Sequence, residues 1–265
     1  MSTTMASGQS AGSSTYSQYD QIILFGDSIT QGSGSQEKGF AFAPALQHDY
    51  IRRFDVINRG FSGYNSSQGI VILPQIFPPP EIAKVRLMTI FFGANDAVLS
   101  GGRQHVPLEK YTSCLEQIIT HPTVRAQGTK LLLLTPPPVN QHQLEPSDWV
   151  KVDNTRRTAE NTKKYADACR EVGNRLGVPV VDIWSAFMKA AGWKEGEPLA
   201  GSIDVPENEK LRALLSDGLH FNPSGYRIMY DEVRKAIETH YPELMPERIP
   251  MNFPSWETAP GQDDS

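Results

Sequence analysis

Several features that would point to particular protein classes are missing from this sequence. It has only two cysteines in 265 residues, Cys114 and Cys169, and both fall within helix-like patterns. They lie too far apart in the chain for a metal-binding motif, and two cysteines give no disulfide framework. We therefore expect two reduced thiols in the core.

Long apolar runs and clustered positive charge are missing as well. No segment approaches the roughly 20 apolar residues that span a bilayer. No Lys/Arg run exceeds two residues and the formal net charge is −5, so nucleic acid is not an expected partner. The N-terminal segment lacks the basic and apolar regions of a secretory signal. Together these absences predict a soluble, cytoplasmic protein without a membrane span.

The composition is that of one α/β domain with extensions at both ends. Residues 1–18 are rich in Ser, Thr and Gly and are expected to form a disordered tail. Residues 242–265 are rich in Pro and polar groups, so we predict an irregular C-terminal extension with Phe253 and Trp256 as isolated aromatic anchors. The domain itself is predicted to cover residues 19–241, with an insertion at 192–216.

Within this domain, strand-like and helix-like segments alternate. Mostly continuous apolar runs, typical of strands covered on both faces, occur at Gln21–Phe25, Asp55–Asn58, Leu87–Phe92, Lys130–Thr135 and Pro179–Ile183. Helical periodicity occurs at Phe40–Arg53, Leu108–Ile119, Thr155–Leu176 and Tyr226–Ile237. The alternation predicts a doubly wound, flavodoxin-like α/β/α sandwich of three layers around a five-stranded parallel sheet.

Polar clusters follow the predicted strands or precede the last helix. In open α/β sheets ligands bind beyond the carboxyl ends of the strands, so these positions are informative. The clusters are Gly26-Asp27-Ser28, the segment 58–65, Gly93-Ala94-Asn95-Asp96 and Asp217-Gly218-Leu219-His220. Each one alone has an ordinary explanation, such as a helix cap, a turn or a solvated pair. Asp27 is expected to support its turn.

Taken together, the clusters contain the residue types of an acyl-transfer site. A serine hydroxyl needs an adjacent base, which His220 can provide to Ser28. Asp217 can orient that imidazole and stabilise its protonated form. The backbone N–H groups of Ser28 and Gly63 and the Asn95 amide can form an oxyanion hole. Because the base must be neutral, activity is expected to fall in acid.

These four clusters resemble the Ser, Gly, Asn and His blocks of the SGNH (GDSL-type) hydrolase family, in the same order. The segments 55–65, 104–108 and 215–220 resemble its isoamyl acetate-hydrolysing esterase branch. The resemblance implies a serine esterase that acts on small carboxylic esters through an acyl-serine intermediate, without a metal or organic cofactor. It also suggests a homodimer. Tyr64 stands where many members carry Asp, and we expect it to line the substrate pocket.

Other interpretations remain open at this point. A thioesterase, a lysophospholipase or a carbohydrate deacetylase would use the same site, and a non-catalytic flavodoxin-like binding module is a weaker alternative. His105 is a candidate for the pocket mouth, with a surface or structural role as its alternative. Ser10 matches a Gly-x-Ser-x-Gly motif but lacks the strand and helix that this motif requires. Aromatic residues that could shape an acyl pocket or simply pack in the core are Trp184, Phe187 and Trp193.

Overall fold

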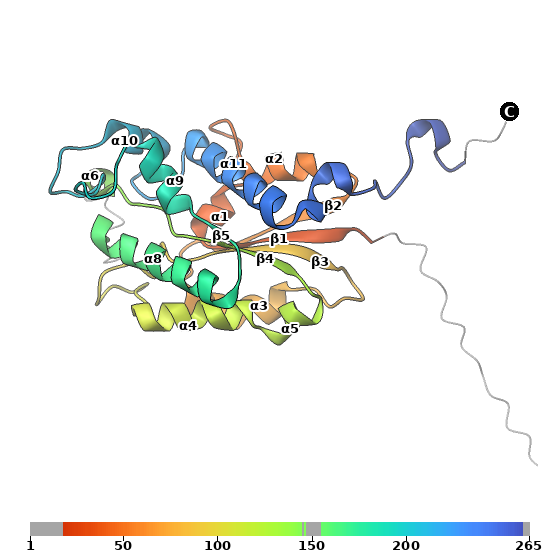
Figure 1. Cartoon of the computed structure of the whole chain (residues 1–265), viewed down its shortest axis with the longest axis horizontal. Helices are drawn as coiled ribbons and strands as arrows, with labels where there is room; N and C mark the ends of the chain where they lie inside the picture. The colour runs from red at the N-terminus through yellow and green to blue at the C-terminus, as the bar shows by residue number, and fades with distance from the viewer. Residues whose placement is uncertain (1–17, 145, 147–154, 262–265) are drawn as a thin grey trace, which may run out of the picture.

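The computed structural model describes residues 18–144, 146 and 155–261. They form a three-layer α/β/α sandwich around a parallel sheet with the strand order β2-β1-β3-β4-β5 (Figure 1). The strands are β1 (Asp20–Gly26), β2 (Phe54–Gly60), β3 (Val85–Phe91), β4 (Lys130–Leu134) and β5 (Val180–Val181). The predicted fold class is therefore confirmed.

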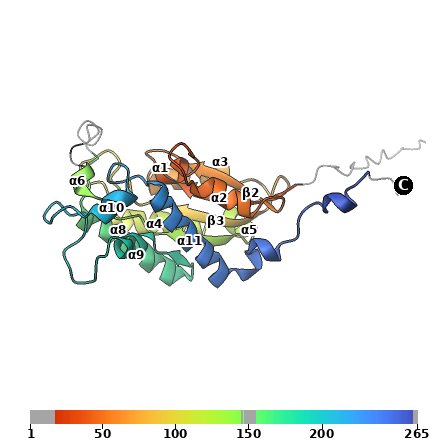
Figure 2. The same cartoon turned by 90° about the horizontal axis from the view of Figure 1, so that it is seen from above.

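Helices cover both faces of the sheet (Figures 1 and 2). One face carries α1 (Ser28–Gly32), α2 (Phe42–Asp49), α9 (Ile183–Ala190) and α11 (Pro223–His240), with α10 (Glu209–Leu214) beside them. The other face carries α3 (Ser66–Ile76), α4 (Leu108–Ile119), α5 (Pro122–Ala126) and α8 (Ala159–Leu176). The short α6 (Gln141–Leu144) follows β4 along the chain.

Strand β1 shows why a continuous apolar run suits this architecture. Ile22 and Leu24 belong to the core under α2, α9 and α11, whereas Ile23 and Phe25 belong to the core under α3, α4 and α8. Successive side chains of a strand point to opposite faces, so each face needs its own apolar set. The strand order reverses at β1 and β3, and ligand crevices in such sheets open at this point.

Several element boundaries differ from the sequence prediction. The helix expected from Thr155 begins at Ala159, because the Thr158 side chain accepts a hydrogen bond from Asn161 N–H and caps it. The strand expected at 179–183 has only two residues, because Asp182 caps α9. The insertion expected at 192–216 contains α10.

Helix α3 was missed altogether. Its start is a capping box, in which the side chain of Asn65 accepts from Gln68 N–H and the side chain of Gln68 accepts from Asn65 N–H. Its apolar residues form an almost continuous run that includes Pro74, and such a run carries little helical periodicity.

The two extensions differ in what the structure describes. The predicted N-terminal tail lies outside the described residues except for Gln18, whose side chain donates to the Glu81 carbonyl. The C-terminal extension contains short 3₁₀ turns at Pro242–Leu244, Pro246–Arg248 and Trp256–Thr258. Its first part packs on the domain, since Leu244 is buried and its carbonyl accepts from Tyr50 Oη at 2.7 Å.

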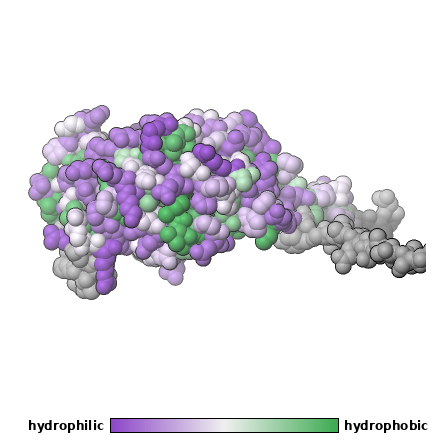
Figure 3. Space-filling model, turned by 90° about the horizontal axis from the view of Figure 1, so that it is seen from below, coloured by the Kyte–Doolittle hydropathy of each residue, from purple (hydrophilic) through white to green (hydrophobic). Residues whose placement is uncertain are grey.

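The surface on the side of α3, α4 and α8 is mostly hydrophilic, with small apolar areas (Figure 3). Across the part of the chain that the structure describes, no helix has the length and apolar character needed to cross a membrane.

Candidate active site

The first strand of the sheet ends in a tight turn that presents Ser28. β1 stops at Gly26, and Ser28 begins helix α1. The Asp27 carboxylate accepts a hydrogen bond from the Ile29 backbone N–H at 2.9 Å, which caps the helix and confirms the predicted role of Asp27 in the turn. A Cβ atom at Gly26 would lie 2.6 Å from the Phe91 carbonyl oxygen, so this close approach of two strands requires glycine.

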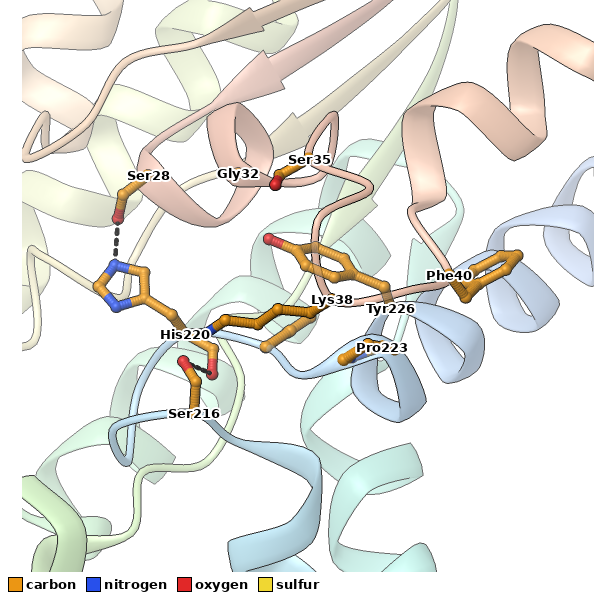
Figure 4. A pocket seen from close by; sticks show the side chains of 10 residues that line it. Ser28, Gly32, Ser35, Lys38, Phe40, Ser216, His220, Pro223 and Tyr226 are labelled. Atoms are coloured by element: carbon orange, nitrogen blue, oxygen red, sulfur yellow. Dashed lines mark hydrogen bonds between the residues drawn. The ribbon is translucent and has the colours of Figure 1, made fainter.

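Ser28 meets an imidazole from a distant part of the chain. Ser28 Oγ lies 2.9 Å from His220 Nε2, although the two residues are 192 positions apart (Figure 4). On the other side of the ring, His220 Nδ1 lies 2.8 Å from Asp217 Oδ2. These are the contacts that let an acid orient a base and the base accept a proton from a hydroxyl.

The loop that carries His220 is organised around Asp217. The second carboxylate oxygen of Asp217 accepts hydrogen bonds from the backbone N–H groups of Leu219 at 3.0 Å and His220 at 2.9 Å. Partial burial raises the pKa of Asp217, but the hydrogen bonds and the charge of His220 outweigh it and hold the pKa below its ordinary value. Asp217 therefore remains a carboxylate at neutral pH, as an imidazolium partner requires.

Ser28, Gly63 and Asn95 line one cavity, and each carries a hydrogen-bond donor. Among the described residues, no group accepts a hydrogen bond from the backbone N–H of Ser28 or Gly63. Gly63 has a φ of 81°, a left-handed conformation that other residues adopt at a cost. The Asn95 amide follows β3 and donates one N–H to the Tyr64 carbonyl at 2.8 Å. An amide nitrogen carries two hydrogens, so a second donor remains on Asn95.

Two residues that sequence reasoning missed complete this side of the site. Arg157 Nη2 donates to Asn95 Oδ1 at 2.9 Å and to Gln104 Oε1 at 3.1 Å. Gln104 Nε2 in turn donates to the Gly63 carbonyl at 2.9 Å. The sequence signals were weak. Arg157 lies in the first turn of the helix expected at Thr155–Leu176, where an exposed arginine is the ordinary expectation, and Gln104 lies in the segment 104–108 without a predicted role.

Ser28 and His220 separate two cavities. The larger has a volume of about 210 Å³, and its lining includes Phe40, Phe221, Tyr226 and Lys38 (Figure 4). The smaller has a volume of about 150 Å³ and is lined by Ser28, Ser62, Gly63, Asn95, Gln104, Thr155, Arg157, Leu219 and His220. An ester whose carbonyl lies at Ser28 could therefore extend its two substituents into the two cavities.

The two side chains predicted to contact substrate are not among those lining either cavity. Tyr64 stacks on Phe61 with ring centroids 5.3 Å apart and packs against the core, while its carbonyl holds Asn95. His105 Nδ1 lies 2.6 Å from the Val98 carbonyl, which ties the ring to the loop after β3. The structure thus gives both residues structural contacts, the alternative already considered for His105.

The aromatic residues considered for an acyl pocket are also absent from the linings of these two cavities. Phe187 is fully buried and packs on Phe221 with ring centroids 4.6 Å apart. Trp184 is 3% exposed and meets Trp193 edge-on at 5.4 Å. The core-packing interpretation is therefore the correct one for Trp184 and Phe187.

Two carboxyl groups are buried beneath the site. Burial raises the pKa of Asp27 to about 7, against the opposing effects of the Ile29 hydrogen bond and the charge of His220. Burial also raises the pKa of Asp96 to about 6, although Asp96 accepts hydrogen bonds from the Ser66 hydroxyl and backbone N–H. Asp27 thus titrates near neutral pH.

Two further points concern metal ligands and Ser10. Within residues 18–144, 146 and 155–261, no group of three or more His, Cys, Asp or Glu side chains could hold a metal ion. Ser10 of the Gly-x-Ser-x-Gly match lies outside the described residues.

Comparison with protein families gives one match over most of the chain. The model of the GDSL-like lipase/acylhydrolase family matches residues 24–228. A GDSL esterase/lipase from Arabidopsis thaliana is 34% identical over 92% of this chain and 96% of its own length. The isoamyl acetate-hydrolyzing esterase of Saccharomyces cerevisiae is 32% identical over 90% of this chain and 94% of its own.

Solved structures share the fold at lower identity. A lipase/acylhydrolase from Enterococcus faecalis has a TM-score of 0.59 at 23% identity, and the match covers 89% of this chain and all of that one. An acetyl xylan esterase has a TM-score of 0.62 at 18% identity, with coverage of 82% and 99%.

Proposed function

This chain belongs to the GDSL-like lipase/acylhydrolase family and is a carboxylic-ester hydrolase, and we propose that Ser28, His220 and Asp217 are its catalytic triad. The observation that carries the proposal is the continuous pair of contacts from Ser28 Oγ to His220 Nε2 at 2.9 Å and from His220 Nδ1 to Asp217 at 2.8 Å. Ser28 and His220 are 192 positions apart in the chain, yet the fold brings their side chains into contact at the wall of a cavity. Such a contact is expected of catalytic partners.

The proposed reaction has two halves. His220 Nε2 takes the proton of Ser28 Oγ as this oxygen attacks the ester carbonyl, and Asp217 stabilises the imidazolium that forms. The negative oxygen of the tetrahedral intermediate is held by Ser28 N–H, Gly63 N–H and the Asn95 amide. His220 then gives its proton to the leaving alcohol. Water, deprotonated by His220, attacks the acyl-Ser28 carbonyl. The bond from this carbon to Ser28 Oγ then breaks, His220 returns the proton to Oγ, and the acid leaves.

The proposed substrates are small carboxylic esters with acetyl or other short acyl groups. Both cavities are smaller than the roughly 300–1,000 Å³ of typical drug-sized ligand pockets, which favours small substrates over lysophospholipids. The larger cavity has aromatic walls that suit an apolar substituent. The yeast relative is named for isoamyl acetate, an ester of this kind.

We also propose a cytoplasmic location and a homodimer. The buried free thiols of Cys114 and Cys169 agree with a reducing compartment. Trp256 is 76% exposed in the C-terminal extension and would be covered in a dimer that uses this segment. Light scattering on the full chain and on Trp256→Ser tests the dimer: a monomeric parent protein would contradict it.

The nucleophile is tested by Ser28→Ala with p-nitrophenyl acetate as substrate. We expect kcat/KM to fall by about 10³-fold or more, as for other triad nucleophiles. Ser113→Ala, on the exposed side of α4, is the matched control and should retain parental activity. Activity of Ser28→Ala within a few fold of the parent would refute the assignment.

A further inference from the structure

Arg157 is buried at the base of the smaller cavity and held by several main-chain groups. Its side chain is only 3% exposed. Its Nε donates to the Ala94 carbonyl and its Nη1 to the Thr155 carbonyl, both at 2.6 Å. Because these contacts fix the plane of the guanidinium, Nη2 has a defined direction, and it points at Asn95 and Gln104.

Arg157 determines which way round the Asn95 amide lies. A guanidinium has donors only, so the atom of Asn95 that faces Arg157 must be the oxygen. The Tyr64 carbonyl has acceptors only, so the atom that faces it must be the nitrogen. With both ends fixed, the second Asn95 N–H cannot rotate away from the cavity, which Asn95 lines.

The same nitrogen of Arg157 reaches the second donor through Gln104. Gln104 Oε1 accepts from Arg157 Nη2, and this orients Gln104 Nε2 toward the Gly63 carbonyl at 2.9 Å. Gly63 has the left-handed φ of 81°, and fixing its carbonyl restrains the turn that carries its N–H. The proposed oxyanion donors of Asn95 and Gly63 lie on separate loops, and Arg157 holds both of them.

The charge of Arg157 acts in the same direction. Burial lowers its pKa to about 10, while the carboxylates of Asp27, Asp217 and Asp96 oppose that change. Arg157 therefore remains a cation at neutral pH. A cation against the amide oxygen polarises Asn95 and makes its N–H a stronger donor to a developing negative charge.

We propose that Arg157 is a positioning residue of the oxyanion hole, which fixes Asn95 directly and Gly63 through Gln104. The inference rests on the proposed function, since it takes Asn95 and Gly63 as the oxyanion donors. Arg157 needs no contact with the reacting atoms for this role. Substitution of Arg157 should therefore lower kcat rather than raise KM, and the loss should depend on the presence of Asn95.

A double-mutant cycle tests this dependence, with the parent enzyme, Asn95→Ala, Arg157→Lys and the double variant. Lysine keeps the buried positive charge but loses the fork that holds both partners. With p-nitrophenyl acetate we expect Arg157→Lys to lower kcat about 10-fold or more while KM stays within about threefold. In the Asn95→Ala background the same substitution should cost less than about threefold.

Arg170→Lys is the matched control. Arg170 is also held by several hydrogen bonds, to Asp182 and Asp167, but it lies on α8 and lines neither cavity at Ser28. Its effect, whatever its size, should be the same with and without Asn95. Equal factors for Arg157→Lys in both backgrounds, or an unchanged kcat, would overturn the inference.

The outcomes separate this inference from the proposed function. Parental activity of Asn95→Ala would remove the oxyanion assignment itself. If Asn95→Ala lowers activity and Arg157→Lys lowers kcat by the same factor with and without Asn95, only the role of Arg157 would be removed.

If Arg157→Lys does not fold, as judged by circular dichroism, Gln104→Met is the variant to measure instead. This variant keeps the charge of Arg157 and its contacts with Ala94 and Asn95. We expect kcat to fall several-fold at nearly constant KM; an unchanged kcat would overturn the support of Gly63 through Gln104.

Discussion

The two sides of Ser28 are built in different ways. On the proton-transfer side, Asp217 and His220 are three residues apart in one loop, and the carboxylate binds both the imidazole and the backbone of that loop. On the oxyanion side, Gly63, Asn95, Gln104 and Arg157 come from four separate segments. The first side is a local motif, whereas the second exists only after the sheet has formed. Mutations should therefore affect the two sides differently.

The largest expected effect concerns the proton-transfer side. Asp217→Asn should lower kcat/KM by about 10²–10⁴-fold, because an amide at this position stabilises the imidazolium poorly and favours the wrong tautomer. Steady-state hydrolysis of p-nitrophenyl acetate measures this loss. Asp204→Asn replaces an exposed carboxylate in the preceding loop and should be neutral. Near-parental activity of Asp217→Asn would remove Asp217 from the triad.

An intermediate effect is expected at Gly63 on the oxyanion side. Alanine at a φ of 81° is strained by about 1 kcal/mol, and relief of that strain should move the N–H and lower kcat about 10-fold. Gly128→Ala is a matched control, because its φ is 63° and no atom lies within 4 Å of the added Cβ. Both variants should lose similar thermal stability, but only Gly63→Ala should lose kcat. Equal kcat values for the two would contradict the assignment of Gly63.

The smallest expected effect concerns stability beneath the site. The pKa of Asp27 is raised by burial from 3.8 to about 7, so the folded protein keeps a proton that the unfolded chain releases. Its carboxyl therefore destabilises the fold progressively as the pH rises from about 4 to 7. Asp27→Asn keeps an acceptor for Ile29 N–H and removes this titration.

Thermal melting at pH 5 and pH 8 measures the difference. The melting temperature of Asp27→Asn relative to the parent should increase by a few degrees from pH 5 to pH 8. A difference that does not change with pH would contradict the raised pKa of Asp27.

How well the sequence predicted each part depends on how local its contacts are. The five strands and the Ser28 turn follow from apolar runs and from the cap of Asp27, which are readable within a few residues. Arg157 could not be identified, because its partners at 94, 95 and 104 become neighbours only in the fold. Likewise, the resemblance led us to expect Tyr64 in the substrate pocket, and His105 was a candidate for the pocket mouth with a structural role as its alternative. In the structure Tyr64 stacks on Phe61, and His105 contacts the Val98 carbonyl.

The most direct test of the account is mass spectrometry of the full chain after reaction with a fluorophosphonate. The base on one side of Ser28 and the donors on the other should make this hydroxyl the single reactive nucleophile. We predict one adduct per chain, on the peptide that contains Ser28, and no adduct in Ser28→Ala. An adduct on another residue, or an unmodified Ser28 peptide in an enzyme that the reagent has inactivated, would contradict the central claim.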